Sequence, residues 1–406
     1  MTFTRLVLLA ICSTLLLSPA SRAQPGGQYM VSAANPHAAQ VGLDILAAGG
    51  SAVDAAIAAQ LVLGLVEPQS SGIGGGGFLM HYRAADQVID AYDGRETAPA
   101  AATGDMFLGT DGKPRKFYDA VVGGLSVGTP GLLRMLELAH QDHGKLPWAD
   151  LFAPAIRLAT DGFQVSPRLH YLIDRDAKRL TTFDSTRSYF YQPDGTALPV
   201  GSLLRNTAYA DVLQQVAQGG ADKFYNGAIA ADIVRTVREA TRNPGLMTLE
   251  DLSGYRAVKR QAVCGLYQNN HICGMPPPSS GGVTVAQMLG MLEGYDLAAM
   301  APDSLSAAHL IAESGRLAFA DRNLYLADTD FVPAPLKGLL DPAYLKSRAA
   351  QISLKSSIGK AEAGTPPQDH GSFTPMQDDF ERESTTHLSV LDADGNAVSM
   401  TSSVEN

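Results

Sequence analysis

Residues near the C-terminus combine the side-chain types that nucleophilic chemistry requires. Thr385 opens a segment in which apolar and polar residues alternate, and Ser403 and Glu405 lie near its end. A threonine hydroxyl is a weak nucleophile that needs a base and a positioned neighbour. A hydroxyl and a carboxylate on the same sheet face could supply such surroundings. A solvated sheet face rich in serine and threonine explains the same pattern, and the pattern alone favours that explanation.

The register of an expected hairpin over 385–406 decides whether these side chains meet. A two-residue loop would pair Leu388 with a threonine, whereas a three-residue loop ending at Gly395 pairs it with Met400. The longer loop puts apolar beside apolar, and glycine can adopt the left-handed conformation that this loop needs. We therefore predict the three-residue loop, which places Thr385 opposite Ser403.

A second candidate follows an expected strand at Gln87–Tyr92. Arg95 lies in the segment Asp93–Glu96. A guanidinium at a strand end can hold a substrate carboxylate through paired hydrogen bonds. A surface turn with a salt bridge is the more common fate of such residues, and the pattern alone favours the turn.

Two further motifs match catalytic patterns in form only. Gly72, Gly74 and Gly77 match G-x-G-x-x-G, but a helix precedes them and a strand follows, which is the wrong order for a dinucleotide site. We expect a close backbone crossing there. Ser126 lies in Gly-Leu-Ser-Val-Gly, but the next helix is expected to begin at Pro130, too late for a nucleophile elbow.

Metal ligands are sparse. His140 and His143 lie three residues apart near an expected helix end, without a carboxylate at ligand spacing. We expect a solvated helix terminus, no metal and no cofactor.

Hydrophobic periodicity indicates the elements that must position the candidates. A helix is expected to begin at Pro36, and Ser51 is expected to cap an almost wholly apolar, buried helix over Val53–Leu65. A strand at Phe78–Arg83 precedes the one at Gln87–Tyr92. Further strands cluster near 255–275, and 353–384 is expected to be a mobile surface segment. The remaining helices are expected at Pro130–Gln141, Trp148–Thr160, Ser166–Arg175, Tyr209–Gln218, Ile229–Thr241, Val283–Gly294 and Leu305–Leu326.

Composition limits the classes of function. The 406 residues are 45% hydrophobic and 18% charged, with a formal net charge of −10. Such a chain can bury a core, whereas its negative field repels phosphate backbones, so we expect no nucleic-acid partner. The length exceeds that of a single small domain. Long apolar helices with scattered strands favour mixed α/β layers.

The first 23 residues are expected to be a signal peptide. Arg5 precedes the apolar run Leu6–Leu17, and Ser21-Arg22-Ala23 offers small residues at a cleavage site. The run is shorter than the roughly 20 residues that span a bilayer. We expect an exported protein, periplasmic or secreted, that begins at Gln24 and has no membrane span.

Two cysteines remain after that cleavage. Cys264 and Cys273 face each other across an expected hairpin that turns at Gln268-Asn269, in a pair whose side chains approach closely. A disulfide and two buried thiols are equally compatible with this spacing.

Several segments together resemble the γ-glutamyltransferase family in order and spacing, from about residue 29 onward. The most specific are Glu67–Phe78, which begins Glu-Pro-Gln-Ser-Ser-Gly, and Met275–Gly282, which reads Met-Pro-Pro-Pro-Ser-Ser-Gly-Gly. The others are Asn35-Pro36, Gly49–Ala56, Asp93–Glu96, Gly128–Gly131, Ala320–Arg322 and Thr385–His387.

The resemblance implies an N-terminal-nucleophile hydrolase, an α+β protein with an αββα sandwich. It implies that a precursor cleaves itself between Ser384 and Thr385. Residues 24–384 would form a large subunit, and 385–406 would begin the small subunit of a heterodimer. The freed α-amine of Thr385, with a pKa near 8, would serve as the base.

The resemblance also implies a substrate pocket. Arg95 would hold the α-carboxylate of a γ-glutamyl donor such as glutathione, Ser403 would orient the nucleophile, and Glu405 would contribute to substrate binding. Water, an amino acid or a dipeptide would then take the acyl group. Two alternatives are a cephalosporin-acylase-like amidohydrolase and a non-catalytic module resembling the large subunit.

The resemblance extends only 22 residues into the expected small subunit. The downstream acidic residues and oxyanion region of the family lie beyond residue 406. We therefore expect the 406-residue chain alone to fold poorly, to expose an apolar sheet face, and to lack γ-glutamyl transfer activity.

Overall fold

The computed structural model describes residues 29–367 and 385–404. The expected signal peptide, the cleavage residue Ser384 and the candidate Glu405 lie outside these ranges. No helix among the described residues is long and apolar enough to cross a membrane.

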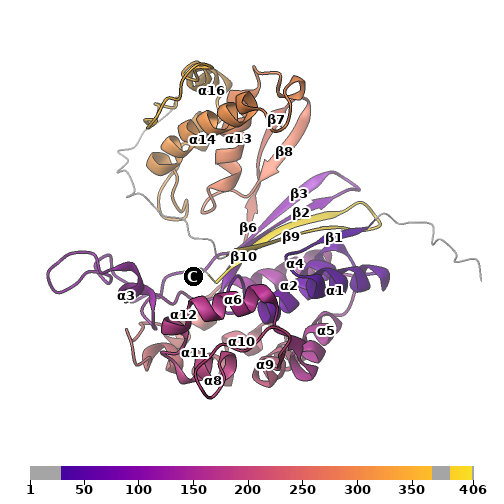
Figure 1. Cartoon of the computed structure of the whole chain (residues 1–406). Helices are drawn as coiled ribbons and strands as arrows, with labels where there is room; N and C mark the ends of the chain where they lie inside the picture. The colour runs from indigo at the N-terminus through magenta and orange to yellow at the C-terminus, as the bar shows by residue number, and fades with distance from the viewer. Residues whose placement is uncertain (1–28, 368–384, 405–406) are drawn as a thin grey trace, which may run out of the picture.

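An antiparallel sheet organises the chain (Figure 1). Its strand order is β1-β9-β10-β2-β3-β6, so the last two strands of the chain lie between strands from its first hundred residues. The bounds are β1 Met30–Ser32, β9 Thr385–Leu391, β10 Ala397–Ser403, β2 Gly76–Arg83, β3 Val88–Gly94 and β6 Val258–Gln261.

Helices cover one face of this sheet (Figure 1). Helix α2 is central to that layer, and every one of its residues except Gly64 is buried. The predicted cap at Ser51 is confirmed, and it is a capping box in which Ser51 and Asp54 exchange side-chain and backbone hydrogen bonds. The layer consists of α1 Pro36–Ala47, α2 Ala52–Val66, α4 Leu132–His143 and α5 Trp148–Asp161.

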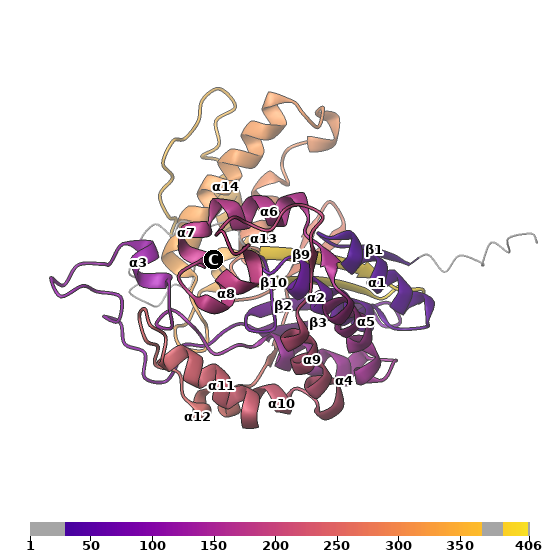
Figure 2. The ribbon, with the colours of Figure 1, turned by 60° about the horizontal axis from the view of Figure 1, so that its bottom comes forward.

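Further helices lie on the side of this layer away from the sheet, and the segment around α3 projects from the body (Figures 1 and 2). Two short strands, β4 and β5, pair with each other near them. The bounds are α3 Phe117–Val121, β4 Phe163-Gln164, α6 Pro167–Arg175, α7 Ala177–Leu180, α8 Asp184–Phe190, β5 Leu203-Leu204, α9 Thr207–Gly219, α10 Asp222–Tyr225, α11 Gly227–Arg238 and α12 Leu249–Gly254.

A second body stands beyond the other face of the sheet (Figure 1) and has its own hydrophobic core. Within it Asp321 and Arg348 are both buried, and their charged groups lie 3.1 Å apart. Its elements are β7 Val263–Tyr267, β8 Asn270–Gly274, α13 Gly281–Leu292, the 3-10 turn Leu297–Ala299, α14 Leu305–Tyr325, α15 Leu336–Leu339 and α16 Pro342–Ala349.

The β7–β8 hairpin has the predicted register. Cys264 pairs with Cys273, and both turn residues, Gln268 and Asn269, have positive φ angles. The structure joins the two cysteines by a disulfide.

Most helix predictions agree with the structure to within about two residues. The predicted start at Pro130 is wrong, because α4 begins at Leu132. Thr129 instead exchanges backbone hydrogen bonds with Thr97, which holds it in an extended bridge and delays the helix. The three-residue strand β1 was not predicted, since a segment that short shows no period. Residues 353–367 form no helix or strand.

The C-terminal hairpin adopts the predicted three-residue loop. Leu388 pairs with Met400, Thr385 pairs with Ser403, and Gly395 has a φ of +83°. Side chains alternate between a buried face and an open face along both strands. The apolar residues on the buried face, Leu388, Val390, Val398 and Met400, form part of the core on the side of helix α2.

The open face of β9 and β10 is polar. It presents hydroxyl and imidazole side chains, which water solvates without the cost of exposing an apolar surface. Its polar members are Thr385, His387, Ser389, Ser399, Thr401 and Ser403, and the partly buried Leu391 and Ala397 lie on the same face at the hairpin loop.

Candidate functional site

Thr385 and Ser403 lie side by side at one end of the sheet, where β9 begins and β10 ends. Thr385 is the first residue of β9 and Ser403 the last of β10, and the Thr385 hydroxyl donates to the Ser403 hydroxyl at 3.3 Å. Thr385 is exposed, whereas Thr386 points into the buried face. The alternation therefore presents the first of the two threonines, and not the second, to a substrate.

Arg95 lies at the same end of the sheet, directly after β3, which is three strands away from β9. Ser403 pairs with Gly76 at the start of β2, and Gly77 pairs with Gly94 at the end of β3, directly before Arg95. Strands about 4.8 Å apart put Thr385 and Arg95 about 14 Å apart along this row. An extended arginine side chain and a glutamyl chain together can bridge such a gap.

Hydrogen bonds hold the backbone of Arg95 on both sides. Its amide donates to Oδ1 of Asp93 at 2.8 Å, and its carbonyl accepts from the Tyr255 hydroxyl at 2.7 Å. Burial raises the pKa of Tyr255 far above the physiological range, so this hydroxyl keeps its proton. The guanidinium is half exposed and lies over the Phe78 ring, with its Nε 3.9 Å from a carboxylate oxygen of Glu96.

Asp93 also connects this corner to the second body. Its Oδ2 accepts from Nε of Arg260 at 2.6 Å, and Arg260 makes a bidentate pair with Asp330 at 3.0 and 2.6 Å. Bidentate guanidinium–carboxylate pairs define orientation as well as distance. The turn before Arg95 is thus tied to β6 and to the loop after α14.

A buried polar network positions the end of β10. The Ser402 hydroxyl donates to Gln60 on α2 at 2.7 Å, and Gln60 in turn donates to the Ser71 hydroxyl at 3.1 Å. All three residues are buried. The network connects the Glu-Pro-Gln-Ser-Ser-Gly segment to the residue beside Ser403.

The glycine run is a close backbone crossing, as expected. A Cβ on Gly75 would lie 2.0 Å from the carbonyl oxygen of Ser403, so only glycine fits there. Helix α2 precedes the run and β2 follows it, the reverse of a dinucleotide-binding order. Ser126 is exposed and donates to the carbonyl of Val121, and no helix starts at it.

His387 is a neighbour of the row to which sequence reasoning assigned no role. It lies two residues after Thr385 on the same face, and its Nδ1 is 2.8 Å from the Thr401 hydroxyl. Burial lowers its pKa below the ordinary value, which favours the neutral imidazole near pH 7. The signal available was the period-2 alternation that puts residues 385 and 387 on one face.

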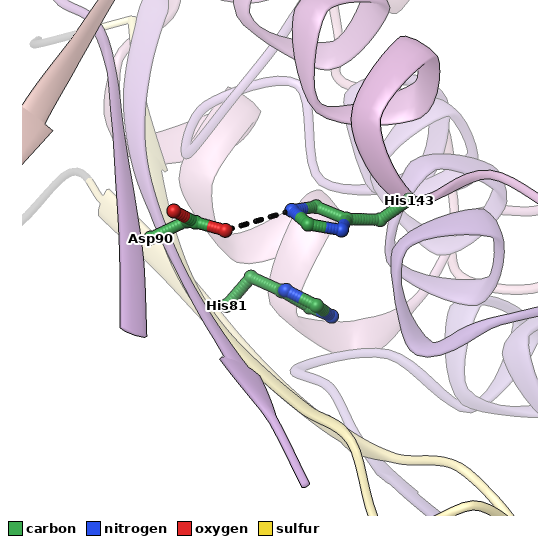
Figure 3. Close-up of side chains that lie close together, drawn as sticks. All are labelled: His81, Asp90 and His143. Atoms are coloured by element: carbon green, nitrogen blue, oxygen red, sulfur yellow. Dashed lines mark ion pairs between the residues drawn. The ribbon is translucent and has the colours of Figure 1, made fainter. Parts of the chain in front are cut away.

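A second cluster lies at the other end of β2 and β3 (Figure 3). His143, which was interpreted as part of a solvated helix end, meets His81 and Asp90 there. His140 does not join them, since its Nε2 is 2.9 Å from the Leu146 carbonyl. The carboxylate comes from a strand some 50 residues away, so no local spacing could have indicated it.

A six-stranded antiparallel sheet with helices on one face, and a threonine at the open start of an inner strand, is half of the four-layer arrangement of N-terminal-nucleophile hydrolases. The family model described as Gamma-glutamyltranspeptidase matches residues 38–406. The chain belongs to this family.

Named relatives agree with this assignment. The chain is 38% identical to the glutathione hydrolase proenzyme of Escherichia coli (strain K12), a match that covers 92% of this chain and 62% of that protein. It is also 38% identical to the acylase ACY 1 proenzyme of Pseudomonas sp. (strain V22), over 93% of this chain and 66% of that protein.

A solved structure agrees as well. The γ-glutamyltranspeptidase of Helicobacter pylori superposes with a TM-score of 0.79 at 32% identity, over 84% of this chain and 96% of that chain. The present chain spans only about 62% of the length of the Escherichia coli proenzyme.

Proposed function

We propose that the complete protein is a γ-glutamyltransferase that also hydrolyses glutathione. It matures by cleaving the bond between Ser384 and Thr385, and residues 24–384 and the segment beginning at Thr385 then form a heterodimer. The observation that carries the proposal is the row of strand ends that aligns Thr385, Ser403 and Arg95 at one end of the sheet.

The chemistry follows from the positions in that row. Oγ1 of Thr385 attacks the γ-carbonyl carbon of the donor, and the new α-amine accepts the hydroxyl proton. The C–N bond breaks, and the leaving amine departs with a proton. Water or the amine of an amino acid or dipeptide then attacks the γ-glutamyl ester and restores the threonine.

Ser403 and Arg95 would act on different atoms. Ser403 positions Oγ1 of Thr385 through the hydroxyl contact at 3.3 Å. Arg95 pairs with the donor's α-carboxylate, and Glu405 contributes to the same pocket. No cofactor is needed, because the nucleophile and its base are one residue.

The proposed location is outside the cytoplasm, in the periplasm or the medium. The N-terminal pattern of Arg5, an apolar run and small residues before Gln24 supports export. Mass analysis of the protein recovered from the periplasm and the medium would detect a mature start at Gln24.

Self-cleavage is the decisive test of the proposed function. The complete protein should yield a fragment that begins at Thr385, seen by intact mass and N-terminal sequencing. Thr385→Ala should abolish both the fragment and the turnover of a γ-glutamyl anilide, whereas Thr386→Ser should leave a fragment starting at residue 385. A fragment that starts at Thr386 would place the nucleophile on the buried face and contradict the proposal.

A second candidate function is amide hydrolysis of a cephalosporin-type substrate. It is favoured by the likeness to a solved cephalosporin acylase from Bacillus halodurans, and by the acylase ACY 1 relative, which is as similar in identity as the glutathione hydrolase. Arg95 discriminates the two, because it is suited to a donor that carries an α-carboxylate. Comparing glutaryl and γ-glutamyl anilides on one preparation would decide between them.

A further inference from the structure

Three side chains from three elements meet beside β2 and β3, away from the row that holds Thr385. They are His81 of β2, Asp90 of β3 and His143, the last residue of α4 (Figure 3). One donor atom of each lies within 4.8 Å of those of the other two. We propose that these residues bind one divalent transition-metal ion of the zinc type.

Two of the donors are already spaced as ligands of one ion. Nε2 of His143 lies 3.1 Å from Oδ2 of Asp90. Ligands about 2.0–2.1 Å from a tetrahedral ion lie about 3.3 Å from each other. Two imidazole nitrogens and a carboxylate oxygen form a donor set that suits zinc, with a fourth position for water.

The third donor is an unsatisfied buried nitrogen. His81 is only 3% exposed, and its Nδ1 makes no hydrogen bond with any described residue. Oδ2 of Asp90 likewise makes no hydrogen bond within the described ranges, and its contacts there are ion pairs with Nε2 of His143 at 3.1 Å and with Arg83 at 3.7 Å. Buried polar atoms are normally paired, so two such atoms in one cluster point to a ligand between them.

The surroundings orient the carboxylate. Lys259 lies 3.1 Å from Oδ1 of Asp90 and 3.1 Å from Asp142, which leaves Oδ2 directed at His143. The Tyr92 hydroxyl donates to Asp142 at 2.6 Å and lies 2.8 Å from Nε2 of His143. The contact of Lys259 with Asp90 is of the kind that orients a metal ligand, whereas coordination through Nε2 of His143 would replace the contact of that nitrogen with the Tyr92 hydroxyl.

The local charge balance also favours a cation. Arg83 lies 3.7 Å from Asp90 but is bound bidentately by Asp86 at 2.7 and 2.8 Å. The cluster and its immediate neighbours therefore hold three carboxylates, those of Asp86, Asp90 and Asp142, against the two cationic side chains of Arg83 and Lys259.

Binding requires one imidazole to turn. The His81 and His143 rings are stacked with centroids 3.9 Å apart and planes 28° apart, and stacked rings do not aim their lone pairs at one point. Rotation of the His81 ring toward Asp90 would bring its free Nδ1 to the ion.

The ion would be structural rather than catalytic. Asp90 and Arg95 are five residues apart along extended backbone, about 16 Å. The site links α4 to two central strands, so occupancy should stabilise the fold and leave the proposed nucleophile untouched. The proposal is therefore independent of the proposed function.

Metal binding is tested first on the unaltered protein after removal of metals by a chelator. Calorimetric titration with Zn²⁺ should show one equivalent per chain with micromolar or tighter affinity, and the unfolding temperature should rise by a few degrees at saturation. Co²⁺ in the same site should give visible absorption and shift the ring protons of His81 and His143. Absence of stoichiometric binding, or Co²⁺ shifts at other histidines only, would overturn the proposal.

Variants then identify the ligands. Asp90→Asn and His143→Gln should each weaken binding at least about 100-fold. His140→Gln is the matched control, since it lies one turn earlier on α4, outside the cluster, and should bind as the unaltered protein does. Unchanged affinity in both ligand variants would contradict the site. The Co²⁺ shifts on the unaltered protein decide the question if a variant does not fold.

Discussion

The corner around Arg95 is built so that the backbone, and not only the side chain, is held in place. Asp93 and Tyr255 are almost fully buried and contact the amide and the carbonyl of Arg95. The side chain itself is half exposed at the sheet edge. This combination is typical of a residue that must present a charge to a ligand at a defined point.

Arg95→Ala in the complete protein should impair use of the donor while self-cleavage continues. Loss of one partner from a charge-assisted pair in a closed pocket costs about 2–5 kcal/mol, which is about 30-fold or more in kcat/KM. Steady-state kinetics with a γ-glutamyl anilide measures the effect. Arg187→Ala is the control, because Arg187 is exposed on α8 and pairs there with the exposed Asp184. Equal kinetics for the two variants would show that Arg95 forms only a surface salt bridge and does not bind the donor.

At the scale of elements, the buried helix α2 is the support on which the C-terminal hairpin rests. Its residue Gln60 binds Ser402, and the amide of Ala52 at its start donates to Asp392 in the hairpin loop at 3.1 Å. Lys145, in the loop between α4 and α5, pairs with Asp394 of the same hairpin loop. The hairpin is thus connected to elements more than 200 residues earlier in the chain.

Ser51→Ala should destabilise α2 and with it the sheet. The substitution removes the hydroxyl that accepts a hydrogen bond from the amide of Asp54. Loss of an N-cap lowers the free energy of unfolding by about 1 kcal/mol, and by up to about 2 kcal/mol. Urea unfolding should show a lower midpoint with an unchanged slope. Ser188→Ala, at an exposed position on α8 where the hydroxyl donates to the nearby Ser185 carbonyl, should leave the midpoint within error. A midpoint equal to that of the control would show that the capping box contributes nothing.

At the scale of the whole molecule, the buried histidine pair makes stability depend on pH. Burial and the neighbouring His143 lower the pKa of His81 from 6.5 to about 4, against the opposing fields of Asp90 and Asp392. The unfolded chain therefore binds a proton as pH falls below about 6.5, and the folded chain does so only near pH 4. Proton uptake by the unfolded state alone lowers the free energy of unfolding across that window.

Urea unfolding at pH 7, 6 and 5, in the presence of a chelator, should show this loss. His81→Gln should have a smaller decrease between pH 6.5 and 5 than the unaltered protein, because the titrating group is gone. His37→Gln, at an exposed position on α1, should retain the full decrease. Parallel pH profiles for the unaltered protein and His81→Gln would show that the acid sensitivity arises elsewhere.

Short-range patterns in the sequence were sufficient to predict several features of the structure. The hairpin register over 385–403 followed from apolar pairing and from the one glycine able to take a left-handed conformation, and the structure has that register. The cap at Ser51 and the Cys264–Cys273 pairing were predicted from residues within ten positions of each other. These features depend on short-range sterics and hydrogen bonds, which neighbouring residues determine by themselves.

Tertiary structure decided where those elements meet. Strand β1 exists because β9, more than 350 residues later, pairs with it, and Thr129 is extended because Thr97 binds it. The row from Thr385 to Arg95 and the cluster of His81, Asp90 and His143 both join residues from distant strands and helices. A one-dimensional pattern shows which face a side chain occupies, whereas pairing and packing between remote segments determine which other side chain lies opposite it.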